Sequence, residues 1–502
     1  MRRMQFMTWA SVLVAPGLSP LLSQQRPDPI AVIDSTIEKA RKDFGIPGMA
    51  VAIVRNDSVV FAKGFGVREA GKPDPVDART LFAIGSNTKS FTSTAMAMLV
   101  SDGKVHWNDR VTKWLPGFQL YDPYVTRELT IEDVLSHRSG LGRRGDMLWY
   151  GSTYSRDEVI RRIRYLPPNA PLRTEMGYSN IMFSTGGQIV AAVSGMSYDE
   201  FVRKRIFEPL GMTTSVTSVT ELSTKPDVAT PHSLAKGVAT PIPHRNLDNV
   251  APAGSIYSSA AEIAQYLRFQ LGRGTYNGTR LVSGFTLDRT WIPHVNAGGA
   301  GDSVTSTSSY GMGWVLLTYR GHRIAWHNGG IDGMLSEMWT LPDDKIGVTI
   351  LTNGSPQNMG NPLVMQIIDQ LIGAPKKDRL GEALAQSKQG AAAQELREKA
   401  TAAERQQGTH PALPLDRYAG TYKDEMYGDL TIGSENGKLV ARFMTFTAEL
   451  EHWHFNTFKG TWKPASLAGG SFINFQLDTL GKVAKAEVEG VAVFTRDQTP
   501  EP

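Results

Sequence analysis

The chain has 502 residues, and with 41% hydrophobic residues it can bury full cores in two or three domains. Its 53 basic and 49 acidic residues are interspersed and leave a net charge of only +4, so the broad basic footprint of a nucleic-acid-binding protein is missing. The chain contains no cysteine, which excludes disulfides, thiolate metal sites and a cysteine nucleophile. We therefore expect a folded protein that binds no nucleic acid.

Residues 1–23 predict an export signal. Arg2 and Arg3 precede a mostly apolar run from Met4 to Val14, and prolines and small residues follow. This order is typical of a signal peptide, with a disordered leader as the alternative. No other run approaches the ~18 apolar residues that span a bilayer. The N-terminus thus predicts an exported protein, periplasmic or secreted, without a stable membrane span.

Residues 24–375 predict an α+β domain. An amphipathic helix is expected over 30–44, followed by a hairpin of strands 49–54 and 59–67 that turns at Asn56-Asp57. Early and late strands could complete one antiparallel sheet flanked by helices, with an all-helical insert between them. The expected helices of the insert are 130–135, 156–165, 184–193, 198–207 and 260–271, and the late strands are 312–319, 323–327, 335–341 and 347–352.

The remaining residues predict a linker over 376–412 and a small β-barrel over 413–502. The linker is rich in Ala, Gln, Lys and Glu, with Gly390 and Gly408 as breaks, which favours a partly helical segment. About five short strand patterns follow Pro414, at the spacing of a small all-β domain. These patterns cover 418–422, 430–443, 450–462, 472–476 and 484–494.

Ser86 and Lys89 are the first residues whose pattern points to chemistry. Apolar residues recur at helical spacing from Ser86 onward, so a helix is expected to begin there. A capping box would place Glu or Gln at position 89, whereas Lys89 puts a cation where the helix dipole disfavours it. Residues three apart share a helix face, so the amine meets the serine hydroxyl, and the dipole favours the neutral amine that can take a proton.

The Ser-x-x-Lys pattern alone is a weak signal. Ser101-Lys104 and Ser233-Lys236 also match it, and a coincidental surface pair explains any single match. Only the Ser86 pattern stands at the start of an apolar helix. Its serine can attack a carbonyl at neutral pH only if Lys89 is desolvated or lies near other cations.

Tyr178-Ser179-Asn180 forms a second group. A phenol near a buried cation can be held partly as phenolate and pass a proton, and a neighbouring amide can bind a substrate carbonyl. Of the 15 tyrosines, only Tyr178 has Asn two positions later. The alternative is a helix cap by Asn180, with Tyr178 as a packing residue.

His327-Asn328-Gly329-Gly330 is a third group, at the end of the expected strand 323–327. Glycines let a backbone N–H approach a ligand closely, as an oxyanion hole requires. A plain hairpin turn is the alternative, because a basic residue followed two positions later by glycine also occurs at Arg138 and Lys345.

In this order, the three groups resemble the motifs of the penicillin-recognising serine hydrolases, which include class C β-lactamases, DD-peptidases, D-aminopeptidases and related esterases. The likeness extends to residues 130–141, 252–258 and 310–314, and it covers roughly residues 30–375. Residues 414–498 resemble the lipocalin-like domain that is often attached to such hydrolases.

The resemblance implies catalytic roles for residues of all three groups. Ser86 is the acylated nucleophile, and Lys89 and Tyr178 share the acid and base work. The backbone N–H groups of Ser86 and Gly330 form the oxyanion hole.

The resemblance also implies substrate-binding roles. Asn180 binds the acyl-side amide of the substrate, and Asn328 and Gly329 lie in the substrate-binding strand. His327 stands where β-lactamases and DD-peptidases keep a lysine for the substrate carboxylate. A histidine neutral at pH 7 binds an anion less well than lysine, which moves weight from β-lactam hydrolysis toward an esterase or a D-amino-acid peptidase.

The sequence thus predicts a serine hydrolase that forms an acyl-enzyme on an amide, β-lactam or ester bond of a small molecule or peptide. It needs no metal or other cofactor; His452 and His454 could share one strand face, but no third ligand is near. A sensor that is acylated by penicillin or peptidoglycan and does not turn over is the alternative. Trp149 and Tyr150 could line the cleft or simply pack. The oligomeric state is left open.

Overall fold

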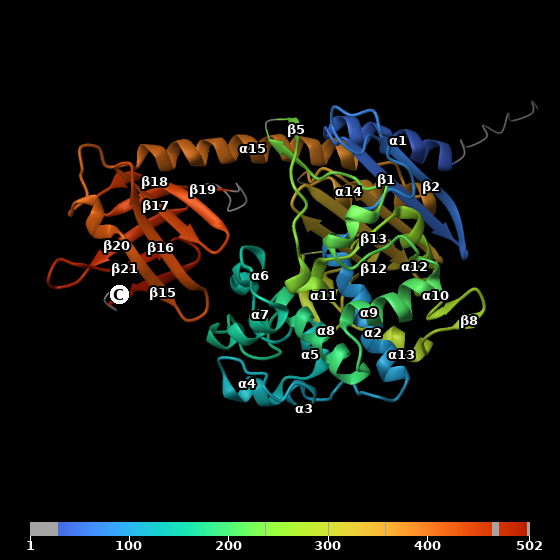
Figure 1. Cartoon of the computed structure of the whole chain (residues 1–502). Coiled ribbons are helices and arrows are strands. Elements are labelled where there is room, and N and C mark those ends of the chain that lie inside the picture. Colours follow the sequence, from blue (N-terminus) through green and yellow to red (C-terminus); the bar gives the residue numbers. More distant parts are fainter. Residues whose placement is uncertain (1–28, 236, 300, 357, 464–470, 499–502) are drawn as a thin grey trace, which may run out of the picture.

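The computed structural model describes residues 29–235, 237–299, 301–356, 358–463 and 471–498. The expected export signal, residues 1–23, lies outside these ranges. Figure 1 shows a large body of sheet and helices, a separate barrel, and one long helix that joins them. Among the described residues, no helix combines the length and the apolar character needed to cross a bilayer.

The centre of the large body is an eight-stranded antiparallel sheet with the order β2-β1-β14-β13-β12-β11-β10-β9. Strand β1 pairs with both β2 and β14, so early and late strands join as expected. Asn56 and Asp57 have positive φ angles of 48° and 62° in the β1–β2 turn. The strands are β1 Gly48–Arg55, β2 Ser58–Gly66, β9 Val295–Gly298, β10 Ser308–Tyr310, β11 Val315–Tyr319, β12 His322–Ile331, β13 Met334–Leu341 and β14 Ile346–Thr352.

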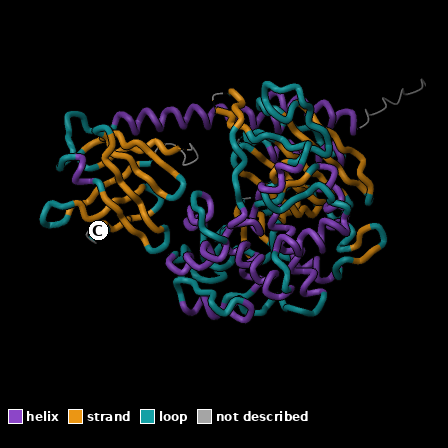
Figure 2. The backbone as a smooth tube through the Cα atoms, viewed as in Figure 1, coloured by secondary structure: helices purple, strands orange, loops and turns teal. Residues whose placement is uncertain are grey.

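Helices cover both faces of this sheet, as Figure 2 shows. In β1, Met49, Val51 and Ile53 pack with α1 (Pro29–Asp43) and α14 (Gly360–Ile372). The alternate residues 50, 52 and 54 pack on the other side, with α2 (Thr88–Ser101) and α12 (Ala260–Leu271). The period of two in a strand explains why β1 is apolar at nearly every position.

The helical insert lies below this sheet in Figure 1 and is built from short helices around α8. Helix α5 begins with a capping box between Thr130 and Asp133. Helix α8 begins at Asn180, with Ser179 as its cap, four residues earlier than expected. Residues 180–183 are all buried, so this first turn lacks the polar face by which an amphipathic helix is recognised in a sequence. The helices are α3 Val111–Trp114, α4 Pro123–Glu128, α5 Ile131–Leu135, α6 Met147–Tyr150, α7 Arg156–Arg162, α8 Asn180–Ser194, α9 Tyr198–Val202, α10 Glu208–Leu210, α11 Ala251–Gly254 and α13 Gly284–Asp288.

Three short two-stranded sheets complete the body. Their strands are β3 Phe82–Ala83 with β6 Tyr257–Ser258, β4 His232–Ala235 with β5 Val238–Pro241, and β7 Thr275–Tyr276 with β8 Thr279–Arg280.

The C-terminal part is a closed barrel of eight strands rather than about five. Three of the expected strand patterns each contain two strands, which are joined by tight turns at Asn436-Gly437, Phe455-Asn456 and Glu489-Gly490. Aromatic side chains such as Tyr418, Phe475 and Phe494 fill the interior, so the barrel encloses a packed core. The strands are β15 Gly420–Asp424, β16 Gly428–Glu435, β17 Lys438–Phe443, β18 Phe446–His454, β19 Thr457–Lys463, β20 Phe472–Leu477, β21 Val483–Val488 and β22 Ala492–Arg496.

The segment expected as a partly helical linker contains one continuous helix, α15 (Arg379–Ala403), which runs through Gly390. Both of its ends are held. At the start, the Arg379 guanidinium donates to Asp369 at 2.8 Å and to the Tyr319 hydroxyl at 2.7 Å. Just past the end, Arg405 donates to the Trp453 carbonyl of the barrel at 3.0 Å.

Candidate active site

Ser86 lies in a short 3₁₀ turn, Gly85–Asn87, directly before α2, and its side chain caps no helix. The backbone at this point presses against strand β12. A Cβ on Gly85, whose φ is +49°, would stand 2.8 Å from the Gly330 nitrogen. Only glycine fits this left-handed conformation and this close approach. The turn therefore holds Ser86 beside the backbone of Gly330.

Lys89 is fully buried on the first turn of α2. Its Nζ lies 2.9 Å from Ser86 Oγ, 2.7 Å from Asn180 Oδ1 and 2.9 Å from the Ala253 carbonyl oxygen. Burial and, second, the positive charge of Arg143 hold the pKa of Lys89 well below its ordinary value, against a smaller opposing effect of Asp146. The site thus favours a neutral amine next to the serine hydroxyl.

The Tyr178 ring lies beside the Lys89 amine and the Arg143 guanidinium. Its ring centroid is 4.8 Å from Lys89 Nζ and 4.2 Å from the Arg143 guanidinium. Burial raises the pKa of Tyr178 to about 12, although a hydrogen bond with Ser86 and the charge of Arg143 act to lower it. This direction is opposite to the expected partial phenolate, because desolvation outweighs the nearby charge. Tyr178 is a neutral phenol at pH 7.

Asn180 connects Lys89 to an acid that sequence reasoning missed. Its Oδ1 accepts from Lys89, and its Nδ2 donates to both carboxylate oxygens of Asp146 at 3.2 Å. Asp146 also accepts from Trp149 Nε1 at 2.8 Å, and burial raises the pKa of Asp146. The amide thus orients the lysine in this structure.

Strand β12 continues through the glycines, and the turn comes later, at Asp332-Gly333. Alternation along the strand leaves Asn328 and Gly330 exposed and buries His327 and Gly329. A Cβ on Gly329 would stand 1.8 Å from the Ile84 carbonyl oxygen, so glycine is needed for β12 to lie against the Ser86 turn. The same carbonyl accepts from Ser336 Oγ on β13 at 2.6 Å.

His327 does not line the cleft, in contrast to the expected contact with a substrate carboxylate. It is 2% exposed, with Nε2 3.1 Å from the Tyr310 hydroxyl and Nδ1 2.6 Å from the Asn328 carbonyl oxygen. Burial lowers the pKa of His327 to about 3, so the ring is neutral. Gly329 is likewise covered, whereas Asn328 and Gly330 line the cleft.

The cleft at Ser86 has a volume of about 260 Å³. Its cationic wall is Arg143, whose side chain is 64% exposed and whose guanidinium lies 3.6 Å from an Asp146 oxygen. Sequence reasoning missed Arg143 because it lies in an irregular stretch with no motif. Trp149, which the sequence marked only as a possible cleft residue, also forms part of the wall.

The other matches to the serine pattern lie elsewhere. Ser101 is at the C-terminal end of α2, where its hydroxyl accepts from the Ser283 backbone. Ser233 is on β4, and Lys236 is outside the described residues. In the described ranges, no group of three or more His, Cys, Asp or Glu side chains could hold a metal ion, and His452 bonds instead to the Phe455 carbonyl.

Comparison with known proteins assigns the large body to a family. Residues 33–369 match the family model described as β-lactamase. The chain belongs to the β-lactamase family. Residues 404–501 match a domain of unknown function, DUF3471.

Relatives in this family include hydrolases and a penicillin-binding protein. The chain is 31% identical over 451 residues to an unguisins hydrolase of Aspergillus violaceofuscus, covering 81% of this chain and 77% of that protein. It is 28% identical over 344 residues to penicillin-binding protein 4 of Amycolatopsis lactamdurans, covering 66% of this chain and 88% of that protein. These relatives support a hydrolase of this family.

Two solved structures support the fold. An octameric penicillin-binding protein homologue from Pyrococcus abyssi aligns over 93% of this chain and all of its own, with a TM-score of 0.63 and 22% identity. A class C β-lactamase from Rhodobacter sphaeroides aligns over 68% of this chain and 98% of its own, with a TM-score of 0.54 and 21% identity. The broader match of the first includes the barrel region.

Proposed function

We propose that this hydrolase works through an acyl-enzyme on Ser86 and cleaves an amide, β-lactam or ester bond. The observation that carries the proposal is the 2.9 Å contact between Ser86 Oγ and a buried Lys89 amine whose pKa is depressed. Serine is a weak nucleophile until a base takes its proton, and a neutral amine at this distance is such a base.

In the proposed acylation, Lys89 accepts the hydroxyl proton while Ser86 Oγ attacks the substrate carbonyl. The carbonyl oxygen becomes an oxyanion, which the backbone N–H groups of Ser86 and Gly330 stabilise. The close packing of Gly85 on Gly330 supports this pairing of donors.

Collapse of the tetrahedral intermediate breaks the bond to the leaving group, which needs a proton. Tyr178 is suited to donate it, because it is a neutral phenol that hydrogen bonds to Ser86. The lysine ammonium returns a proton to the tyrosine. Water then attacks the acyl-enzyme by the same steps in reverse order and restores Ser86.

The charge distribution bears on substrate choice. The neutral His327 supplies no cation, whereas Arg143 presents one at the wall of the cleft. We infer that Arg143 takes the part that a lysine has in the related β-lactamases and meets a carboxylate when the substrate carries one. Esters and amides without a carboxylate do not need it.

Labelling with a fluorophosphonate, followed by intact-mass measurement, tests the nucleophile. The unmodified chain should gain one adduct and the Ser86→Ala variant none. Ser101→Ala, which removes the serine of a second Ser-x-x-Lys pattern, is the matched control and should label fully. An adduct on Ser86→Ala would refute the assignment.

Product release from a chromogenic ester separates an enzyme from the alternative, a non-hydrolysing sensor. Continued release at steady state is expected for the hydrolase. A single burst equal to the enzyme concentration would favour the sensor.

A further inference from the structure

A second, larger cavity adjoins the Ser86 cleft. It has a volume of about 1030 Å³, at the upper end of ordinary ligand pockets, whereas the cleft itself has about 260 Å³. Trp149 lines both cavities. The segment 247–250 borders both: Leu247 and Val250 line the cleft, while Asp248 and Asn249 line the larger cavity.

The barrel supplies part of the wall of this large cavity. Thr445, in the hairpin between β17 and β18, lines it, and its backbone nitrogen and its hydroxyl donate to the Gly151 carbonyl at 2.9 and 2.8 Å. Phe446 fills the space over Gly151, where a Cβ would meet its ring at 2.2 Å, and it stacks on Tyr150 at 6.4 Å. The large body and the barrel therefore form the wall of this cavity together.

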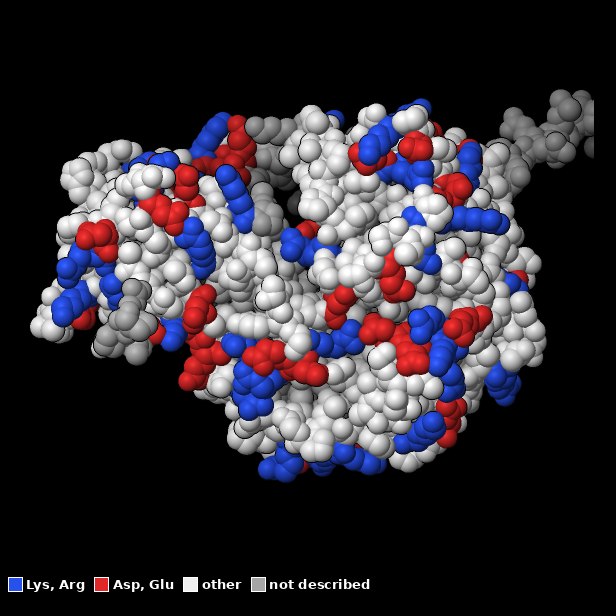
Figure 3. All heavy atoms as spheres, viewed as in Figure 1, with Lys and Arg blue, Asp and Glu red and all other residues white. Residues whose placement is uncertain are grey.

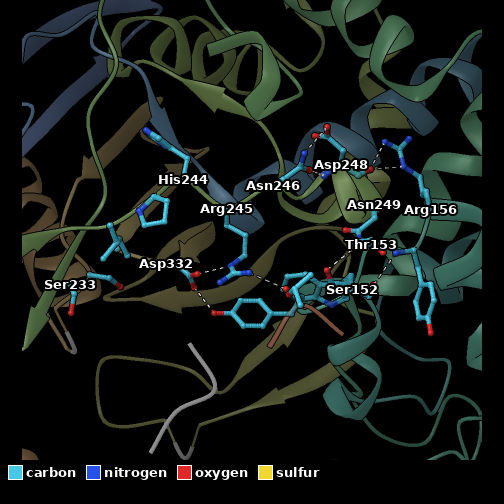
Figure 4. A pocket seen from close by; sticks show the side chains of 18 of the residues that line it. Ser152, Thr153, Arg156, Ser233, His244, Arg245, Asn246, Asp248, Asn249 and Asp332 are labelled. Carbon is cyan, nitrogen blue, oxygen red and sulfur yellow. Dashed lines mark hydrogen bonds and ion pairs between the residues drawn. The ribbon is translucent and has the colours of Figure 1, made fainter. Parts of the chain in front are cut away.

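Both arginines in its wall are already paired, and the Asp248 carboxylate accepts from neutral groups, Ser218 Oγ at 2.8 Å and Asn246 Nδ2 at 3.3 Å. The Arg245 guanidinium donates to Asp332 at 2.6 Å, and the Tyr150 hydroxyl donates to the same carboxylate at 2.7 Å (Figure 4). Arg156 donates to the Asp248 carbonyl oxygen at 2.9 Å and to Asp199 at 3.2 Å. A polyanionic ligand would meet no uncompensated cation here, so the site suits an uncharged ligand.

The rest of the wall combines aromatic rings with hydroxyl and amide groups. Figure 4 shows Ser233 and His244 toward one end and Thr153 and Asn249 toward the other. Apolar faces with scattered hydrogen-bonding groups match the alternation of side chains and amides in a peptide.

Resting on the function proposed above, we propose that the large cavity is an extended subsite that binds an uncharged peptide portion of the substrate, several residues long, next to the scissile bond. The bound chain passes Trp149 from one cavity to the other. Binding energy from such remote contacts raises kcat/KM for long substrates over short ones.

Chain-length dependence of hydrolysis tests this. The short probe is the p-nitrophenyl ester of acetylglycine, and the long one adds four neutral Ala and Gly residues on the acyl side. A second pair of substrates consists of anilides of acetylglycine. The short one is the plain anilide, and the long one carries the same four residues on the aniline ring, which is the amine side of the scissile bond. At least about a tenfold gain in kcat/KM is expected in one of the two series; no gain in either would overturn the proposal.

Two tryptophan variants locate the effect. Ser233→Trp fills the cavity from β4 and should bring the long-to-short ratio close to one. Val238→Trp adds the same bulk to the partner strand, where the side chain is 63% exposed and outside the cavity, and should keep the wild-type ratio. Equal ratios in both variants would contradict the location.

The outcomes separate this inference from the proposed function. Turnover of the short ester and labelling of Ser86 without any length effect would leave the hydrolase standing and remove the subsite. Competition by a neutral N-acetylglucosamine oligomer, but not by the unesterified peptide, would overturn the peptide assignment in favour of a glycan.

Discussion

Lys89 Nζ and Asn180 Oδ1 lie 2.7 Å apart, and the other end of the same amide is bound to Asp146. The amide therefore fixes the direction of the amine as well as its distance from Ser86. Asn180→Asp would place a carboxylate against the lysine and raise its pKa. We expect the acid limb of the kcat/KM profile to move to higher pH, and kcat at pH 7 to fall by about 10²-fold.

Asn180→Ala distinguishes charge from orientation. It removes the bond without adding a charge, so it should lower kcat without the upward shift of the acid limb. An identical shift in both variants would mean that loss of the amide, and not the added negative charge, raises the pKa of Lys89.

Arg143 and Asp146 act on the pKa of Lys89 in opposite directions. Removing the positive charge in Arg143→Gln should raise this pKa, which moves the acid limb to higher pH. Removing the negative charge in Asp146→Asn should lower the pKa and move the limb to lower pH. The pH dependence of kcat/KM on a neutral ester measures both shifts, and shifts of the same sign would exclude Lys89 as the titrating base.

Gly329 and Gly330 differ sharply in the space around them. A Cβ on Gly329 would stand 1.8 Å from the Ile84 carbonyl oxygen, whereas one on Gly330 meets nothing within 4 Å. Gly329→Ala should therefore lower the free energy of unfolding by about 3 kcal/mol. Gly330→Ala should change it by less than about 1 kcal/mol. Urea unfolding monitored by tryptophan fluorescence compares them, and equal midpoints would refute the packing described here.

Glu337 gives the stability of the fold a pH dependence. It is 1% exposed on β13, accepts from Trp339 Nε1 at 2.9 Å, and has a pKa raised by burial from 4.5 to about 8. Between these two values the unfolded carboxyl loses its proton and the folded one keeps it. The free energy of unfolding therefore falls as the pH rises from 4.5 to 8, by an amount on the order of a few kcal/mol.

Glu337→Gln removes this titration. Its urea midpoint should change less between pH 5 and pH 9 than that of the unmodified chain. Parallel curves for the two proteins would show that another group governs the pH dependence.

Much of the fold and part of the site follow from local patterns. The contact between Ser86 and Lys89 follows from helix geometry, and the antiparallel sheet follows from the alternation of its strands. The sequence predicts too few barrel strands, because tight turns such as Asn436-Gly437 interrupt the apolar pattern for only two residues.

Other features of the site depend on tertiary packing. The side of β12 that His327 occupies follows only once the strand is known to continue to Ile331. Arg143 and Asp146 lie in and beside a short 3₁₀ turn with no periodicity, and their charges matter only because Lys89 is buried beside them. Burial also reversed the expected direction for Tyr178, since desolvation depends on neighbours that no local pattern names.

Helix α15 fixes the distance between the large body and the barrel. Its 25 residues span about 37 Å, and both ends are anchored by arginines. An insertion of four residues would lengthen it by about 6 Å and turn it by a little more than one full rotation. The Phe446 ring could then no longer pack against Gly151. Natural relatives with a longer or shorter spacer should accordingly differ in substrate range even when every residue around Ser86 is the same.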